Sequence, residues 1–496
     1  MKNSLSYQAF FLIAAKAADA LTLLVLGMIL ARVLTLEDYG TYRQVWLLYY
    51  TLIPLFTLGI ATSVNYFVPG FEPGQQKTFI FQTYSGLFIL GFFFAVFLYA
   101  GADFFGAWFN NPALGQVIKI FSLVPLLTMP TSYYHNLYIC LKKAIVAAGI
   151  LTSATLVRFI VIAVAVYTEP SLKNIFTALL IYYVLEFTIL SFLIYRPFKA
   201  VPLDWKKQNI REQLKFTVPI GLSSVVGAFS RQIDKLIISG YFTAREFAIY
   251  ANGAMELPLA RILNAAVMSV LMPELVLLYN RGEYQKMLSL WHRSIRKVSL
   301  IILPVMVFLF IFAREFLVLL YSEKYLASAG IFQIYLLTLP VRVTTFGSVL
   351  LAAGLSRVIM YYSIYTVLIS VVLNLVMIRL WGVWGAALAT VAGVYIITFL
   401  QLGKICSVVN CTFKDVYPWK ITLHILVVSL AAGLVPQAGK LMISNGFISL
   451  IVNGFAYLSL FGGLAVKTKL LTGKEMEQAI NKVRSSLGCS GRSGQR

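Results

Sequence analysis

Residues 144–167 read AIVAAGILTSATLVRFIVIAVAVY, an apolar run that a single charged side chain, Arg158, interrupts. About 20 consecutive apolar residues are enough to cross the hydrocarbon core of a bilayer as an α-helix. A charged side chain at the centre of such a helix costs roughly 2.5–3.5 kcal/mol on insertion scales if it faces lipid. The run therefore predicts a transmembrane helix whose arginine faces water or an opposite charge inside the protein.

Similar apolar runs recur along the whole chain of 496 residues, of which 59% are hydrophobic and only 12% are charged. Soluble domains carry about 25% charged residues. We therefore expect an all-α membrane protein with about 14 transmembrane helices. The expected helices cover residues 10–33, 44–68, 79–101, 116–139, 144–167, 172–195, 216–240, 248–279, 298–320, 327–351, 358–380, 384–408, 420–438 and 447–466. Pro258 and Pro273 are expected to bend or shorten the eighth, because proline removes an intrahelical hydrogen bond.

The loop charges predict how the chain is oriented. Lys and Arg gather in the loops at 142–143, 196–215 and 281–297 and in the C-terminal tail. Basic loops stay on the cytoplasmic side, so both termini are expected there. The same bias explains the net charge of +22 without a nucleic-acid partner. Lys16 and Asp19 interrupt the first apolar run, and no small-residue cleavage site follows it, so we expect an uncleaved first helix.

An internal repeat appears when the sequence is shifted by 208 residues. Thr35, Asp38 and Tyr42 then meet Thr243, Glu246 and Tyr250, and near the same offset LLTMP at 126–130 meets LLTLP at 336–340. This agreement predicts a duplicated six-helix unit, with both copies inserted the same way up. We expect an N-terminal lobe at 1–200 and a C-terminal lobe at 210–410, pseudo-symmetric around a central cavity. Two extra transmembrane helices at 418–466 and a basic cytoplasmic tail at 467–496 would follow.

Ionisable side chains within the expected helices are the main functional signal. They are Lys16, Asp19, Arg158, Glu186, Arg231, Asp234, Lys235, Glu256, Arg261, Glu274 and Arg342. Basic groups outnumber acidic ones, which favours a net-cationic cavity and an anionic cargo. The alternative is that local ion pairs or contacts with backbone carbonyls neutralise these groups one by one, or that they extend to the membrane surface.

The candidate substrate ligands are the basic residues Arg231, Lys235, Arg261, Arg342, Arg158 and Lys16. Arginine suits phosphate because its planar guanidinium stays charged and donates two parallel hydrogen bonds. Lys16 and Asp19 share a helix face, as do Arg231, Asp234 and Lys235, so each acid could also pair with a base beside it. The candidates for ion coupling are Asp19, Glu186, Glu256 and Asp234, because a carboxylate withdrawn from water exchanges protons more readily. Glu274 is expected near a membrane surface.

The sequence contains no Walker loop, zinc motif or nucleophile elbow. Its four cysteines lie far apart or in membrane segments, which argues against a metal site or disulfide framework. We therefore expect no enzymatic activity, cofactor or metal. Tyr133, Tyr134, His135, Asn136 and Tyr138 form a polar aromatic patch that could contact a sugar or could pack between helices.

Several motifs resemble the polysaccharide (O-antigen) flippase family of the multidrug/oligosaccharidyl-lipid/polysaccharide exporter superfamily. They are RVLTLEDYGTY at 32–42, GIATSVNYF at 59–67, Asp234-Lys235, AGLSR at 353–357 and the run from Asn374 through LWGVWGAALAT at 380–390. The similarity spans about residues 5–465. We interpret 35–42 and 382–390 as fold motifs, because small residues such as Gly382 and Gly385 permit close helix contact.

The resemblance implies a multi-pass protein of the bacterial inner membrane. Its cargo would be a polyprenyl-diphosphate-linked oligosaccharide, moved from the cytoplasmic to the periplasmic leaflet by alternating access without ATP. Membrane lipids, a proton or sodium ion and a polysaccharide polymerase are the expected partners. A peptidoglycan lipid precursor or a small-molecule drug is the alternative cargo. We predict that Arg231→Ala or Arg342→Ala lowers transport and leaves membrane insertion intact.

Overall fold

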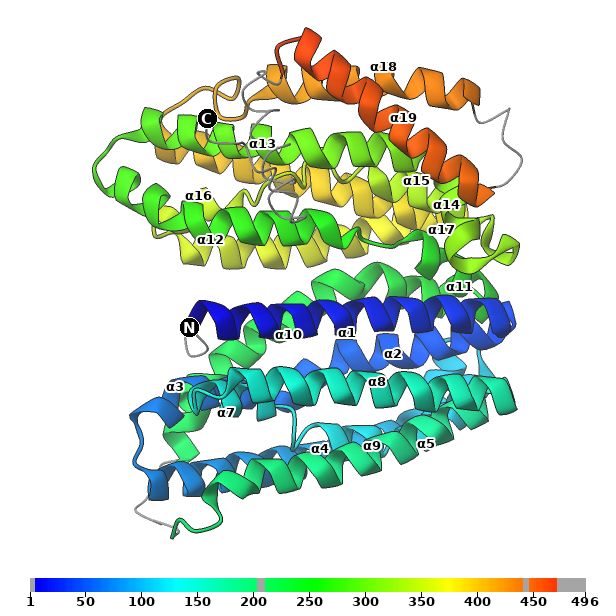
Figure 1. Ribbon diagram of the computed structural model, residues 1–496, viewed down its shortest axis with the longest axis vertical. Helices are drawn as coiled ribbons and strands as arrows, with labels where there is room; N and C mark the ends of the chain where they lie inside the picture. Colours follow the sequence, from blue (N-terminus) through cyan, green and yellow to red (C-terminus); the bar gives the residue numbers. More distant parts are fainter. Residues whose placement is uncertain (1–4, 203–209, 440–445, 471–496) are drawn as a thin grey trace, which may run out of the picture. The chain divides into compact units, whose positions relative to one another are not determined.

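The computed structural model describes residues 5–202, 210–439 and 446–470, and every regular element in these ranges is a helix (Figure 1). The predicted all-α membrane fold is confirmed. Besides the α-helices, the described chain has three short 3₁₀ turns, Val68–Gly70, Arg196–Phe198 and Glu323–Tyr325.

The number of spans is the point at which prediction and structure differ. In the described ranges nine helices are long and apolar enough to cross a membrane. A tenth span is present if α2 (Leu36–Thr57) and α3 (Ile60–Phe67) cross the membrane together as a bent pair, with an angle of 50° between them. The count of fourteen is not confirmed, partly because some expected spans are broken. The range 116–139 is divided among α5 (Pro112–Phe121), α6 (Val124–Thr128) and α7 (Tyr134–Cys140), and 327–351 between α15 (Ser328–Leu336) and α16 (Gly347–Ala352).

By internal contacts the chain divides into two compact units. Unit 1 holds residues 1–252, 320–327 and 363–390. Its further helices are α1 (Leu5–Val33), α4 (Pro73–Trp108), α8 (Ala144–Thr168), α9 (Leu172–Tyr195), α10 (Ile210–Tyr241) and α11 (Ala244–Gly253). Helix α1 runs along α8, and α4 runs beside α5 (Figure 1). Helix α10 packs against α2 and α3.

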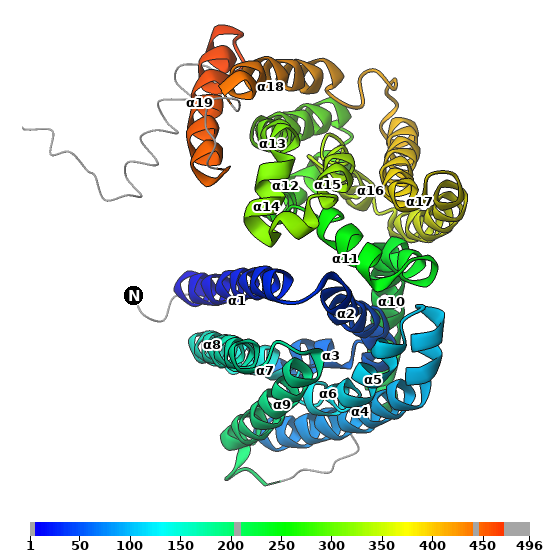
Figure 2. The same ribbon diagram turned by 90° about the vertical axis from the view of Figure 1, so that its right-hand side faces the viewer.

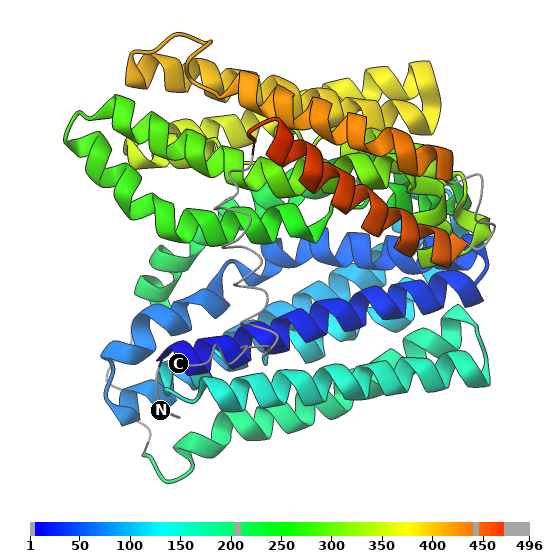
Figure 3. The same cartoon turned by 45° about the horizontal axis from the view of Figure 1, so that its top comes forward.

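Unit 2 holds residues 253–319, 328–362 and 391–496. Its further helices are α12 (Pro258–Asn280), α13 (Tyr284–Ile311), α14 (Ala313–Tyr321), α18 (Trp419–Gly439) and α19 (Gly446–Lys467). Helix α13 lies between α12 and α18, and α19 crosses α18 (Figures 2 and 3). The break expected at Pro258 is present, because α12 begins there and α11 ends at Gly253.

Helix α17 (Ser356–Val409) is two helices joined by a tight turn (Figure 2). The backbone leaves the helical region at Trp381 and Gly382, and Gly382 has a φ of 57°, which glycine adopts without strain. A Cβ on Gly385 would lie 1.9 Å from the carbonyl oxygen of Met377, so only glycine permits this approach. The structural role predicted for this motif is confirmed.

Two helix starts that the shift of 208 residues aligns have the same local structure. At the start of α2, the Thr35 hydroxyl accepts a hydrogen bond from the Asp38 amide at 3.0 Å. At the start of α11, the Thr243 hydroxyl accepts one from the Glu246 amide at 3.3 Å. Each threonine also donates to the acid three residues later, at 2.8 Å. The positions related by the shift therefore form the same helix N-cap.

Candidate functional site

Each unit contains a pocket that includes basic residues predicted from the sequence. In unit 1, residues of α1, α2, α8, α9, α10 and α11 enclose about 300 Å³. We call this space the α2 pocket. The residues used below from its lining are Tyr42, Arg43, Trp46, Tyr50, Arg158 and Lys235. Three cations and no carboxylate line it, so its surface is cationic.

Arg158 is the most constrained of these cations. Its Nη2 lies 2.6 Å from Oδ1 of Asp19, across the contact between α8 and α1. The side chains of Arg158 and Asp19 are 19% and 27% exposed. Thr155 donates a second hydrogen bond to the same carboxylate oxygen at 2.8 Å. Asp19 therefore pairs with Arg158, and not with Lys16, the base beside it in sequence.

Arg43 and Lys235 have no acidic partner among the described residues. Arg43 donates to the carbonyl of Ala251 at 3.3 Å, and its guanidinium carbon lies 5.9 Å from the centre of the Tyr39 ring. A ring face and a carbonyl stabilise a cation but leave its charge uncompensated. Both side chains are partly exposed, so an anion can reach them.

Aromatic rings form one wall of the α2 pocket. Trp46 and Tyr50, one helical turn apart on α2, stack with their ring centres 5.5 Å apart. The Trp46 indole N–H has no hydrogen bond of normal geometry to a described residue, although the Tyr42 hydroxyl lies near it. The Nε–H of Arg158 is also buried without an acceptor in the described chain. The unused Nε–H of Arg158 and two uncompensated cations suit a ligand rich in oxygen acceptors.

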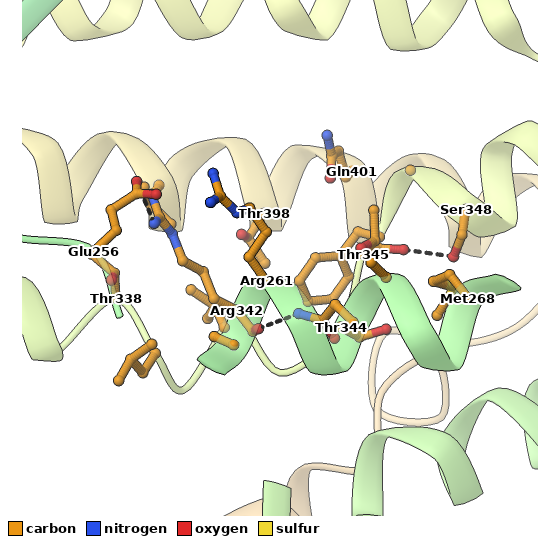
Figure 4. A pocket seen from close by; sticks show the side chains of 18 of the residues that line it. Glu256, Arg261, Met268, Thr338, Arg342, Thr344, Thr345, Ser348, Thr398 and Gln401 are labelled. Atoms are coloured by element: carbon orange, nitrogen blue, oxygen red, sulfur yellow. Dashed lines mark hydrogen bonds and ion pairs between the residues drawn. The ribbon is translucent and has the colours of Figure 1, made fainter. Parts of the chain in front are cut away.

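Unit 2 contains the larger pocket, of about 910 Å³, which we call the α12 pocket (Figure 4). Its polar lining includes Glu256, Arg261, Asn264, Arg342 and Gln401. Arg261 lies in the first turn of α12. Arg342 lies in the non-helical segment between α15 and α16, where its backbone amide bonds back to the carbonyl of Leu339 at 3.0 Å. In Figure 4 the side chains of Arg261 and Arg342 extend in the same direction.

Arg342 is paired, but weakly. Its Nη1 lies 2.7 Å from Oε1 of Glu256, and the two side chains are 34% and 51% exposed. Ion pairs this exposed contribute about 0–1 kcal/mol, so a multiply charged anion can compete with Glu256. Asn264 donates to the carbonyl of Arg342 at 2.8 Å, and its own Oδ1 is buried without a partner in the described ranges. Arg261 forms no ion pair with any residue that the structure describes.

The other predicted residues lie outside both pockets. Lys16 and Arg231 are exposed, on α1 and α10. Asp234 is buried and accepts a hydrogen bond from the Tyr250 hydroxyl at 2.9 Å. Glu186 accepts one from Tyr182 at 2.8 Å on the same helix. Glu274 is exposed on α12.

Arg43 and the aromatic wall were missed by the sequence reasoning. The second span was expected to begin at residue 44, but α2 begins at Leu36, so Arg43 lies two turns inside it. The spacing of Tyr42, Trp46 and Tyr50 at four residues places them on one helix face, and this spacing could have indicated the wall. In the described ranges, no three His, Cys, Asp or Glu residues could together hold a metal ion.

Known proteins resemble the chain in sequence family, in one curated relative and in fold. A sequence model of a family described as polysaccharide biosynthesis protein matches residues 29–330. A probable low-salt glycan biosynthesis flippase of Haloferax volcanii, Agl15, is 21% identical over 267 residues, covering 53% of this chain and 54% of the relative. The chain thus spans about half the length of this curated relative.

Among solved structures, the lipid II flippase MurJ in an inward closed conformation has a TM-score of 0.72 and 16% identity. The match covers 93% of this chain and 100% of that one. An inward-facing multidrug resistance transporter of the MATE family has a TM-score of 0.63 and 12% identity, with 79% and 96% covered. These two structures show the fold that the chain shares with known transporters. Together with the family match over residues 29–330 and the flippase relative, they confirm the resemblance that the sequence motifs indicated.

Proposed function

Because the chain belongs to the polysaccharide biosynthesis protein family, we propose that it is a flippase for polyprenyl-diphosphate-linked oligosaccharides. It moves the cargo from the cytoplasmic to the periplasmic leaflet of the bacterial inner membrane by alternating access, without ATP hydrolysis. The proposal includes two lobes, 1–200 and 210–410, and cytoplasmic N- and C-termini. Independently of this proposal, the chain is a multi-pass membrane protein with a fold that is shared by known transporters.

The observation that carries the proposal is the sign of the charge in the two pockets. The α2 pocket has three cations and no carboxylate in its lining, and the α12 pocket has two cations and one carboxylate. Arg43, Lys235 and Arg261 have no acidic partner in the described chain. A transporter of cationic drugs needs the opposite charge, because attraction between ligand and site determines which sign of ion is concentrated there.

The chemistry of the cargo matches these groups. A diphosphate cannot enter hydrocarbon unaided, because burying an unpaired ion costs tens of kcal/mol by Born estimates. Guanidinium and ammonium groups in a wet pocket replace the lost hydration, and the lipid tail stays in the bilayer. The faces of Trp46 and Tyr50 and the amides of Asn264 and Gln401 are suited to sugar rings and hydroxyls. A membrane potential negative inside favours outward movement of an anion by about 2.3 kcal/mol per charge per 100 mV.

The acidic residues would couple transport of the cargo to the movement of an ion. Asp19, Glu186, Glu256 and Asp234 remain the candidates for exchange of a proton or sodium ion. Of these, Glu256 could leave Arg342 when it is protonated, which would free a guanidinium for the cargo. Membrane lipids and a polysaccharide polymerase are the further partners that we propose.

A second cargo is favoured by one comparison. The similarity to a lipid II flippase extends over nearly the whole chain, so the peptidoglycan lipid precursor is the alternative to an oligosaccharide repeat unit. A small-molecule drug is a weaker alternative, because the pockets are cationic. Competition between the labelled lipid-linked oligosaccharide and each alternative, in the same vesicles, distinguishes these cargoes.

Substitution of the basic residues in the α12 pocket tests the proposal. We expect Arg261→Ala and Arg342→Ala each to lower the rate of transport about tenfold or more, since hydrogen bonds to charged groups contribute about 1.5–3 kcal/mol. The measurement is leaflet accessibility of a labelled lipid-linked oligosaccharide in reconstituted vesicles. Arg281→Ala, which removes an exposed cation outside both pockets, is the control and should transport normally. The loss of transport predicted from the sequence for Arg231→Ala has no basis in these two pockets, because Arg231 lines neither of them. Normal rates in the Arg261 and Arg342 variants would refute the role of the α12 pocket.

A further inference from the structure

Helices α12 and α13 enclose a second groove in unit 2, distinct from the α12 pocket. The groove has a volume of about 910 Å³. Its lining is Ala266, Val267, Val270, Leu271, Glu274, Leu290, Arg293, Ser294 and Lys297. The α12 pocket uses other residues of the same helix, among them Asn264, Met268 and Met272. The two spaces therefore lie on different faces of α12.

The groove combines an apolar floor with two available cations. Arg293 and Lys297 are four residues apart on α13, so their side chains lie on one face of the helix. Both are exposed, and neither forms an ion pair with a described residue. The nearby Lys286 behaves differently, because it pairs with Glu283 at 2.7 Å. Glu274 is the only acid in the lining and is also unpaired in the described chain, so the groove has a net positive charge.

The apolar part of the groove is open. Val270 is 80% exposed on a helix that is apolar and long enough to cross a membrane. In a bilayer, such a surface is covered by acyl chains. The basic pair lies on α13 at the other side of the groove, within the basic segment 281–297 that is expected on the cytoplasmic side. Basic pockets between transmembrane helices on the cytoplasmic side commonly hold anionic lipid headgroups.

We propose that this groove binds an anionic phospholipid of the bilayer. Arg293 and Lys297 hold the phosphate, with the guanidinium donating to two of its oxygens. Val267, Val270 and Leu290 contact the upper part of an acyl chain. The bound lipid would then lie against the helix that carries Arg261 on another face, next to the α12 pocket. This site does not depend on the identity of the cargo.

The test measures lipid binding and not transport. The full-length protein is placed in nanodiscs of phosphatidylcholine with increasing phosphatidylglycerol, and the phosphatidylglycerol retained on gentle extraction is counted by native mass spectrometry. We expect the double variant Arg293→Gln with Lys297→Gln to weaken the preference for phosphatidylglycerol about thirty-fold. The reason is that each basic side chain near the membrane surface attracts an anionic lipid, and this variant removes two of them. The matched control is the double variant Arg211→Gln with Lys215→Gln. Arg211 and Lys215 are also an arginine and a lysine four residues apart, both are exposed on α10, and neither lines the groove.

A third variant separates a lipid from a free phosphate. Ala266→Trp fills the apolar floor and keeps both cations, so it should lose phosphatidylglycerol and keep whatever weak affinity the protein has for inorganic phosphate. Two results would overturn the proposal. One is wild-type retention in the Arg293/Lys297 variant. The other is an equal loss in the Arg211/Lys215 control, which would indicate general surface attraction. Retention of lipid by Ala266→Trp would limit the site to a phosphate and would refute the acyl contact.

Discussion

Arg158→Gln is expected to reduce transport about fifty-fold or more and to destabilise unit 1. The substitution leaves Asp19 without the cation that lies 2.6 Å from it. Breaking a buried ion pair costs about 3–5 kcal/mol, and the partial exposure of this pair reduces the expected loss to about 2 kcal/mol. The α2 pocket also loses one of its three cations and the unused Nε–H donor. The measurements are the apparent Tm of the purified protein and the rate of transport in vesicles.

A second substitution separates these two effects. Asp19→Asn with Arg158→Gln removes the unpaired charge, so the double variant should recover much of the lost stability. Its transport should stay low, because the pocket still lacks the guanidinium. Recovery of transport in the double variant would show that Arg158 acts only by holding α8 against α1. A Tm for Arg158→Gln equal to that of the wild type would refute the structural part of the account.

Gly40→Ala is expected to lower stability by about 3 kcal/mol. A Cβ at Gly40, in α2, would lie 1.9 Å from the carbonyl oxygen of Ala244, at the start of α11. The opposing atom belongs to the backbone, so no side chain can rotate away, and overpacking of this kind costs about 1–3 kcal/mol or more. The displaced helices also carry Tyr39 and Asn252, whose side chains are hydrogen-bonded at 3.2 Å. The apparent Tm and the fraction of monodisperse protein after extraction report the effect.

Gly86→Ala is the matched control for this substitution. Gly86 lies within α4, and a Cβ there would meet nothing within 4 Å. Alanine favours a helix over glycine by about 1 kcal/mol, so this variant should be as stable as the wild type or slightly more stable. If both glycine variants had the same Tm, the close approach of α2 and α11 would be absent in the membrane.

The helical fold could be predicted because each signal for it is local. The run around Arg158 is apolar over a full membrane thickness, and α8 covers it from Ala144 to Thr168. Pro258 interrupts the expected helix at 248–279 and begins α12, because its missing N–H is not needed in the first turn, whereas Pro273 lies inside α12 and does not end it. The two segments that the shift of 208 residues aligns could be recognised because each begins a helix with a threonine and has an acid three residues later.

Breaks within spans were harder to locate. The expected helix at 116–139 contains Pro125 and Pro130, and the structure divides it into three short helices. The expected helix at 327–351 contains Pro340 and ends its first part at Leu336. Hydropathy does not distinguish a continuous span from one with turns that are buried in protein. Arg342, expected in mid-helix, consequently lies in a non-helical segment.

The ion pairs could not be predicted, because their partners are far apart in the sequence. Asp19 has Lys16 three residues before it, but it pairs with a base 139 positions later. Arg342 and Glu256 are 86 positions apart. A single sequence shows which charged residues are close along one helix. Which charged residues of different helices form an ion pair depends on the packing of those helices, here of α8 on α1. Arg43 was missed for a simpler reason, since the predicted start of its helix was eight residues too late.

In the proposed mechanism, uncompensated cations in the two pockets carry a diphosphate-linked sugar across the membrane. The most direct measurement is leaflet accessibility of a labelled polyprenyl-diphosphate oligosaccharide in vesicles that contain the purified protein. The wild type should expose the label on the opposite leaflet, and a folded variant with Arg43→Gln, Lys235→Gln and Arg261→Gln should leave it in place. Equal transfer by the two proteins, or no transfer by the wild type, would contradict the account.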